Sequence, residues 1–177
     1  MINRFIRFWG QSRWNIGFAQ ITPAEVITAP EQLRNTIHWL KHDYKDRFFA
    51  DPFFLQVNEA DMEVLVEEYM YAEKKGRLVV LTVSSRNFAL IDRKELLEQP
   101  SHLSYPAWFE WNGNTYLYPE NGSEHHLPLF KLEGGALQYQ GDLISAEQME
   151  KICPENWLAD ATFLEREGVY YLFATPT

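Results

Sequence analysis

Two aspartates and a glutamate have the residue types needed for acid–base chemistry. Asp51 and Asp160 each open a segment rich in aromatic residues, and Glu120 closes another. Two carboxyl groups that flank a glycosidic bond can cleave it, because the protonated one donates to the leaving oxygen while the ionised one activates water. Burial and mutual repulsion separate the pKa values of such a pair. We therefore take Asp51, Asp160 and Glu120 as candidate catalytic residues.

A structural interpretation stays open beside this catalytic one. An aspartate before Pro or Ala at the start of a strand is a common turn device, because its carboxylate accepts backbone N–H groups. For Glu68 and Glu120, which follow apolar strand sequence, exposure at a strand end is the usual explanation.

Four further side chains are candidates for holding a sugar. The rings of Tyr105 and Trp108 can stack on sugar faces, although packing in the core is the alternative for both. His102 and Glu68 can hydrogen-bond to hydroxyl groups.

Neither a metal nor another cofactor is expected. The adjacent His125 and His126 would point to opposite faces of a strand, and no third ligand is suitably spaced. The single cysteine, Cys153, has no motif partner, which indicates a packed or surface thiol.

The candidate residues belong to a repeat. Three aromatic-rich segments align on Asp51, Tyr105 and Asp160, at steps of 54 and 55 residues. A period near 50 residues built from short strands is typical of the blades of a propeller. The first strand of each blade lines the propeller axis, so these three residues should converge there. A second set is expected at equivalent positions where the second strands end: Glu68, Glu120 and Thr175.

Short strands are predicted around this repeat. In the N-terminal part we expect a strand over 13–21 and a short helix over 30–40. The first repeat should turn at 58–61 and continue into a third strand over 77–83, followed by a helical turn or polar connector over 92–98.

The second repeat should turn at Asn112-Gly113, a strong hairpin signal, and strands follow over 127–132 and 136–139. Ser145 and Gln148 have the spacing of a capping box, which predicts a helix over 145–152. The third repeat should turn at Glu167-Gly168. We predict one all-β domain over 1–177, with an N-terminal strand and helix in 1–47 and blade-like repeats that start at 48, 102 and 157.

The amino-acid composition limits the classes of function that this chain can have. The 177 residues suffice for one domain, and aromatic residues make up 15% of them, enough for a β core. The net charge of −9 argues against nucleic acid, which requires a concentrated basic face. One cysteine excludes an internal disulfide, and neither a signal peptide nor an apolar stretch of membrane-spanning length is recognisable. We expect a cytoplasmic protein.

Several motifs together resemble one family. They are Trp14-Asn15-Ile16-Gly17, Phe49-Ala50-Asp51-Pro52-Phe53, Val66-Glu67-Glu68-Tyr69, His102-Leu103-Ser104-Tyr105-Pro106, Tyr118-Pro119-Glu120 and Asp160-Ala161-Thr162. The chain resembles the propeller domain at the N-terminus of glucosamine inositolphosphorylceramide transferases and of related bacterial proteins. That domain is similar to the five-bladed propellers of arabinanase and β-xylosidase glycosidases. The resemblance implies a five-bladed β-propeller-like fold of the glycosidase type, of which this chain holds about two and a half blades.

The resemblance also implies residue roles. Asp51 matches the general base of the glycosidases, and Asp160 matches the aspartate that orients and tunes the acid. The glutamate that acts as general acid on the next blade has no counterpart here, so Glu120 or a second chain would have to supply it. Two copies could close one ring, which suggests a homodimer.

Three functions remain open at this point. The chain is a carbohydrate-active protein, as a glycoside hydrolase or an accessory to glycosyl transfer; or a non-catalytic module that binds glycans or assembles with a partner; or a truncated propeller without activity of its own. Each predicts a different result in assays of turnover and sugar binding.

Overall fold

The computed structural model describes residues 13–28, 31, 35–154 and 157–177. The described residues form four antiparallel sheets, two of four strands and two of two strands. The N-terminal part holds β1 (Gly17–Phe18), α1 (Pro23–Thr28) and β2 (His38–Trp39). The first large sheet holds β3 (Arg47–Val57), β4 (Asp61–Met70), β5 (Lys75–Ser84) and β6 (Leu90–Leu97). The second holds β7 (Trp108–Trp111), β8 (Asn114–Leu117), β9 (Leu127–Glu133) and β10 (Ala136–Ile144). The chain continues through α3 (Ala146–Ile152) to the hairpin of β11 (Leu158–Arg166) and β12 (Val169–Pro176). A 3-10 turn, η1 (Gly122–Glu124), lies between β8 and β9.

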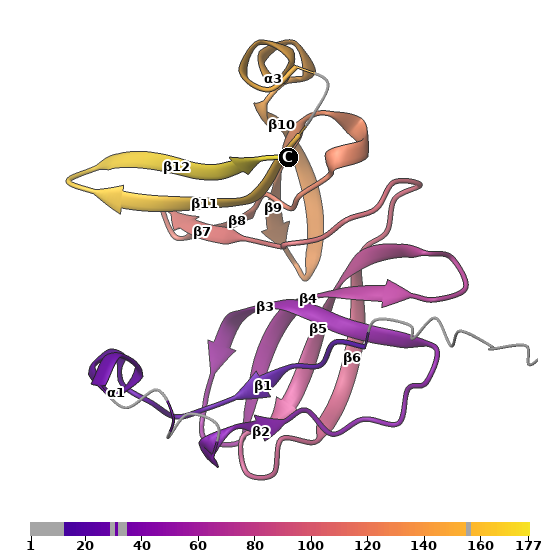
Figure 1. Ribbon diagram of the computed structural model, residues 1–177, viewed down its shortest axis with the longest axis vertical. Coiled ribbons are helices and arrows are strands. Elements are labelled where there is room, and N and C mark those ends of the chain that lie inside the picture. Colours follow the sequence, from indigo (N-terminus) through magenta and orange to yellow (C-terminus); the bar gives the residue numbers. More distant parts are fainter. Residues whose placement is uncertain (1–12, 29–30, 32–34, 155–156) are drawn as a thin grey trace, which may run out of the picture.

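The first sheet is a meander in which each strand pairs with the next in sequence. β4 and β5 pair over ten residues without a register shift. Their alternating apolar residues build one face of the sheet, which includes Val64, Val66, Val79 and Leu81. The segment around β1 and β2 covers this face (Figure 1). The larger core therefore joins the N-terminal segment to the first sheet.

The sheets stack in chain order. Phe53 of β3 reaches the second apolar cluster, where it packs with Ala107, Tyr118 and other residues of the second sheet. The Trp108 indole donates to the Phe54 carbonyl over 3.0 Å and ties the two sheets together. The β11–β12 hairpin then packs against the other side of the second sheet through Phe163 and neighbouring residues (Figure 1).

The three repeats share an unusual backbone conformation. Asp51, Tyr105 and Asp160 have φ angles of 50°, 43° and 54°, in the left-handed region that few residues other than glycine adopt. In β3 and β11 the pairing register shifts at this residue, as in a β-bulge. The alignment of these three residues is thus confirmed by the backbone.

The second set of equivalent residues was predicted wrongly by one position. The residues that pair just before the bulge are Ala50 with Glu67, Ser104 with Glu120, and Ala159 with Thr175. The residue equivalent to Glu120 is therefore Glu67 and not Glu68. Adjacent strand residues point to opposite faces, so this correction moves the carboxyl to the other side of the sheet.

Several predicted elements differ from the structure. The segment over 92–98, expected as a helical turn or connector, lies largely in strand β6. The strand over 13–21 is reduced to the two residues of β1, and part of the helix over 30–40 lies outside the described residues. At the end of that range, His38 and Trp39 form β2. None of the described helices is both long and apolar enough to cross a membrane.

Candidate functional site

Asp51 stands at the junction between the first two repeats. The backbone N–H of Tyr105 donates to Asp51 Oδ2 over 3.0 Å. Asp51 also forms a side-chain hydrogen bond with Glu67, which lies across the bulge on β4. The bulge, which displaces Asp51 from regular pairing, thus presents its carboxyl group both to the next repeat and to a second carboxyl.

Glu67 is almost fully buried, with 6% of its surface exposed. Burial raises the pKa of its carboxyl to about 8, and the charges of Asp51 and Glu120 add to the shift. At neutral pH this shift favours the protonated form of Glu67. We call Asp51 and Glu67 the carboxyl pair.

His102 completes the surroundings of this pair. Its Nδ1 accepts the backbone N–H of Gly76 over 2.8 Å, so the proton of the neutral ring lies on Nε2. This Nε2 is 3.6 Å from Glu67 Oε1. Burial lowers the pKa of His102, which favours the neutral ring at neutral pH. The ring thus lies next to Glu67, at a distance beyond that of a hydrogen bond.

Glu120 and Asp160 form the corresponding junction between the second and third repeats. The backbone N–H of Asp160 donates to Glu120 Oε2 over 3.1 Å. Burial raises the pKa of the Glu120 carboxyl. The side chain of Asp160 itself is exposed. The structure therefore places all three predicted catalytic carboxyls at the junctions between repeats, and two of them accept a backbone N–H from the next repeat.

A cavity of about 360 Å³ opens beside the carboxyl pair. Asp51 and Glu67 form part of its wall, and Trp14 to Gly17 form another part. The Trp14 side chain is 65% exposed, so a large aromatic ring lies open to solvent at the cavity. Trp14 lies in one of the motifs that carry the family resemblance, but it was not among the predicted site residues, because no spacing relates it to the repeats.

Two predicted sugar-binding aromatics serve packing between sheets. The Tyr105 ring meets Phe53 edge to face at 5.2 Å, and its hydroxyl lies 2.8 Å from Thr162 Oγ1. Trp108 makes the bond to Phe54 described above. Neither side chain lines the 360 Å³ cavity. The packing alternative considered for both residues is therefore what the geometry favours.

Glu68 lies away from the carboxyl pair, contrary to its predicted place at the site. Its carboxylate is fully buried on the opposite face of the sheet and is held by three arginines. Arg47 Nη1 donates over 2.9 Å, Arg77 Nε over 2.7 Å and Arg93 Nε over 2.7 Å. Burial alone would raise the pKa of this carboxyl, but the hydrogen bonds from the guanidinium groups hold it below the ordinary value. Glu68 is a structural anion that organises the edge of the first core.

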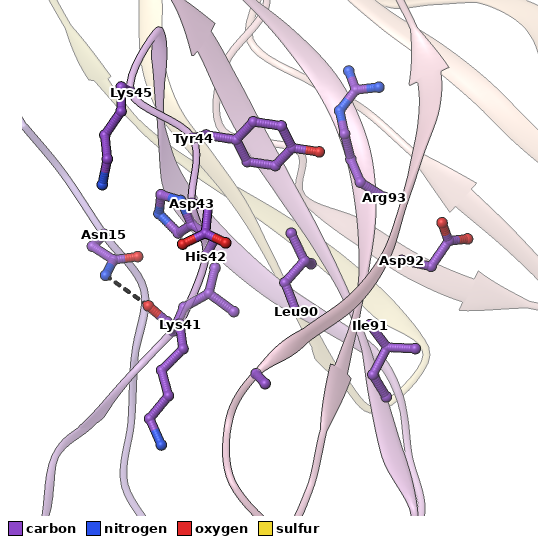
Figure 2. Close-up of a pocket in the computed structure, with 12 residues that line it drawn as sticks. Asn15, Lys41, His42, Asp43, Tyr44, Lys45, Leu90, Ile91, Asp92 and Arg93 are labelled. Atoms are coloured by element: carbon purple, nitrogen blue, oxygen red, sulfur yellow. Dashed lines mark hydrogen bonds between the residues drawn. The ribbon is translucent and has the colours of Figure 1, made fainter.

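A second and larger cavity, of about 1010 Å³, lies between residues 41–45 and the start of β6. Figure 2 shows the side chains that line it, with the Lys41 and Lys45 amino groups well apart. The Asn15 amide donates to the Leu40 carbonyl over 3.1 Å at its margin. Arg93 in its wall is already engaged with Glu68. The cationic groups of this cavity do not converge on one point, so the cavity beside the carboxyl pair is the better candidate site.

Within the described part of the chain, no group of three His, Cys, Asp or Glu side chains is arranged to hold a metal ion. The side chains at the candidate site are carboxyl groups, an imidazole and an indole. Such a set can bind hydroxyl and amino groups, stack against a ring and transfer a proton.

The comparisons with known proteins agree on one family. Residues 34–177 match the family described as glucosamine inositolphosphorylceramide transferase 1, N-terminal. Proteins named glucosamine inositolphosphorylceramide transferase 1 from Oryza sativa subsp. indica and subsp. japonica are each 24% identical over 132 residues, which cover 75% of this chain. The protein of that name from Arabidopsis thaliana is 29% identical over 79 residues, or 45% of this chain.

The match covers a small part of these relatives, 16% of each rice protein and 9% of the Arabidopsis protein. No solved structure matches the chain significantly. Because the family match extends over most of the sequence, this chain belongs to the family of glucosamine inositolphosphorylceramide transferase 1 N-terminal domains.

Proposed function

We propose that this chain is a carbohydrate-binding module that serves glycosyl transfer and that the sugar binds in the cavity beside Asp51 and Glu67. The observation that carries the proposal is one cavity lined by the exposed indole of Trp14, the buried carboxyl of Glu67 and the half-buried carboxyl of Asp51. Its volume of about 360 Å³ is suitable for one small ligand.

The chemistry of the cavity suits a sugar ring. The indole of Trp14 provides an apolar surface for the C–H face of a pyranose. Asp51 offers acceptor oxygens to hydroxyl groups, and the proton on Glu67 provides a donor. The relatives carry glucosamine in their names, and the ammonium group of an amino sugar would be attracted to Asp51. Glucosamine is therefore the first ligand to test.

We also propose that the stacked sheets are successive blades of a five-bladed propeller, with the carboxyl groups near its axis. Two features support this arrangement. The three repeats share a left-handed residue at one position, and a carboxylate of each of the first two repeats accepts a backbone N–H from the next. Two four-stranded meanders and a two-stranded hairpin correspond to two blades and the beginning of a third.

Calorimetric titration with glucosamine, N-acetylglucosamine and myo-inositol tests sugar binding. We expect saturable binding of glucosamine that weakens about tenfold in Trp14→Ala, because the stacking surface is lost. The matched control is Trp111→Ala, which removes another exposed tryptophan on β7 and should leave the affinity unchanged. Equal affinities of the wild type and Trp14→Ala would exclude this cavity as the binding site.

Glycoside hydrolysis is the second candidate function, and the raised pKa of Glu120 favours it. In this scheme Asp51 is the base, Glu120 the acid and Asp160 the residue that tunes the acid. The hydrogen bond between Asp51 and Glu67 weighs against it, since the oxygen of Asp51 needed to activate water is engaged. Chromogenic furanosides and pyranosides test the scheme: turnover by the wild type that is lost in Asp51→Asn and kept in the surface variant Glu63→Gln would support it. Sugar binding without turnover would leave the module non-catalytic.

A further inference from the structure

The last hairpin presents an apolar face to solvent. In the pairing of β11 with β12, Thr162 is opposite Phe173, Leu164 is opposite Tyr171, and Arg166 is opposite Val169. Paired residues share a face of a sheet, so these six side chains form one surface, which we call the outer hairpin face. The opposite face, which carries Phe163 and Leu172, packs on the second sheet.

The alignment of the repeats identifies the residues of the first two repeats that are equivalent to Phe173 on the outer hairpin face. The residues two positions before Glu67, Glu120 and Thr175 are Leu65, Tyr118 and Phe173. Leu65 is 0% exposed and Tyr118 is 2% exposed, whereas Phe173 is 58% exposed. The same position is thus covered in the first two repeats and open in the third.

In the first and second repeats, the residue at this position is covered by the sheet that follows in the chain. Leu65 is paired with Phe53, which packs into the cluster of the second sheet. The hydroxyl of Tyr118 accepts the backbone N–H of Phe163 in the third repeat over 3.0 Å. In both cases the covering element is a hairpin of the next repeat, and a second copy of the chain carries hairpins of this kind.

The outer hairpin face is also suitable for contact between like-charged chains. Along with the turn residue Glu167, its side chains border a groove of about 500 Å³, large enough for aromatic side chains. The six residues of the face include no carboxylate, although the chain has a net charge of −9. The β12 strand carries no charged residue at all, whereas β6, at the edge of the first sheet, has four among its eight. Charged side chains on the edge strands of a sheet normally prevent two molecules from associating through these strands, and β12 has none.

We propose that two copies of this chain dimerise by packing their outer hairpin faces against each other around a two-fold axis. Each copy inserts Tyr171 and Phe173 into the groove of the other, so the contact is self-complementary. In this proposal the two hairpins run antiparallel, so that Arg166 of one copy lies over the start of β11 in the other, where Asp160 stands. This charge pairing sets the relative direction of the hairpins.

Light scattering over a range of protein concentrations tests the dimer, with the full chain as the sample. We expect a mass of twice 20.9 kDa at high concentration and a shift to the chain mass on dilution. Phe173→Asp and Leu164→Asp should each shift dissociation to concentrations at least tenfold higher, because either places a carboxylate in the apolar contact. Ile91→Asp is the control, since it alters an equally exposed apolar residue on β6 and should leave the mass unchanged.

Circular dichroism on each variant separates loss of the dimer from loss of the fold. The charge-swapped pair Arg166→Asp and Asp160→Arg adds a test that does not change the apolar surface: each single change should weaken the dimer and the double change should restore it. A chain that stays monomeric at all concentrations would overturn the proposal, and so would a mass that grows beyond the dimer. A dimer that Ile91→Asp disrupts and Phe173→Asp leaves intact would assign the contact to another face.

Discussion

Glu67 and Glu68 are neighbours on β4, yet their carboxyl groups are held in opposite protonation states. Glu67 faces Asp51 and keeps a proton at neutral pH because it is buried beside other carboxyls. Glu68 faces three guanidinium groups, whose hydrogen bonds stabilise its anionic form. The alternation of a strand thus places one proton donor and one fixed anion within a single dipeptide.

The first prediction concerns Glu68. Glu68→Gln leaves three arginines around a neutral amide, and loss of one partner from a buried ionic network costs about 3–5 kcal/mol. We therefore expect a large fall in the free energy of unfolding, measured by urea denaturation. Glu63→Gln, on the same strand but exposed, is the control and should change it by less than about 0.5 kcal/mol. A loss for Glu68→Gln no larger than that of the control would show that the arginine cluster contributes little.

The second prediction concerns the pH dependence of stability. The pKa of Glu67 is about 8 in the folded chain, against an ordinary value of 4.5. Between these pH values the folded state binds a proton that the unfolded state has released, so this group makes the free energy of unfolding fall as pH rises. Glu67→Gln replaces the protonated carboxyl with a neutral amide and should remove that part of the slope. Thermal unfolding of both proteins from below pH 4.5 to above pH 8 measures the difference, and parallel curves would contradict the assignment.

The third prediction concerns the junction at Asp51. Asp51→Ala removes the acceptor of the Tyr105 N–H, and leaving a buried donor unpaired costs about 1–3 kcal/mol. Asp51→Asn retains an acceptor oxygen and should recover much of that loss. Asp160→Ala is a matched comparison, because Asp160 contributes to its junction through the backbone N–H. Its effect in urea denaturation should be smaller, and a loss as large as that of Asp51→Ala would count against the junction model.

The fourth prediction concerns Gly76, whose backbone bonds to His102. A Cβ atom at this position would collide with the Leu103 carbonyl and lie 2.6 Å from Glu67 Oε1. Gly76→Ala should therefore cost about 1–3 kcal/mol by overpacking and disturb the carboxyl pair at the same time. Gly113→Ala, at a turn tip with open space, strains only its own backbone. We expect sugar affinity to fall in Gly76→Ala and to be unchanged in Gly113→Ala; equal affinities would separate Gly76 from the site.

Features encoded by neighbouring residues were predicted from the sequence. Asn112 and Gly113 have the positive φ angles of the predicted turn, and the capping box of Ser145 with Gln148 is present at the start of α3. Glu167 and Gly168 likewise form the predicted tight turn. Each of these signals depends on a few adjacent residues, so no tertiary information was needed.

Features that depend on distant contacts were missed. The side of the sheet that Glu67 and Glu68 face depends on a bulge at Asp51, which only the pairing register reveals. The charges of β6 hid its strand character, because Arg93 is satisfied by Glu68 some 25 residues earlier in the chain. Trp14 was missed for a related reason: it reaches the cavity because the N-terminal segment folds back over the first sheet.

The backbone hydrogen bonds at the junctions between repeats affect which side chains can occur at equivalent positions of the domain. Tyr105 and Asp160 each hold the preceding repeat through their main-chain N–H groups, so the bond is the same whichever side chain follows. An aspartate and a tyrosine can therefore occupy equivalent places without loss of the architecture. Exchange of these side chains can create new ligand specificities, provided that the new residue tolerates the left-handed conformation and, at position 105, replaces the packing of the tyrosine ring against Phe53.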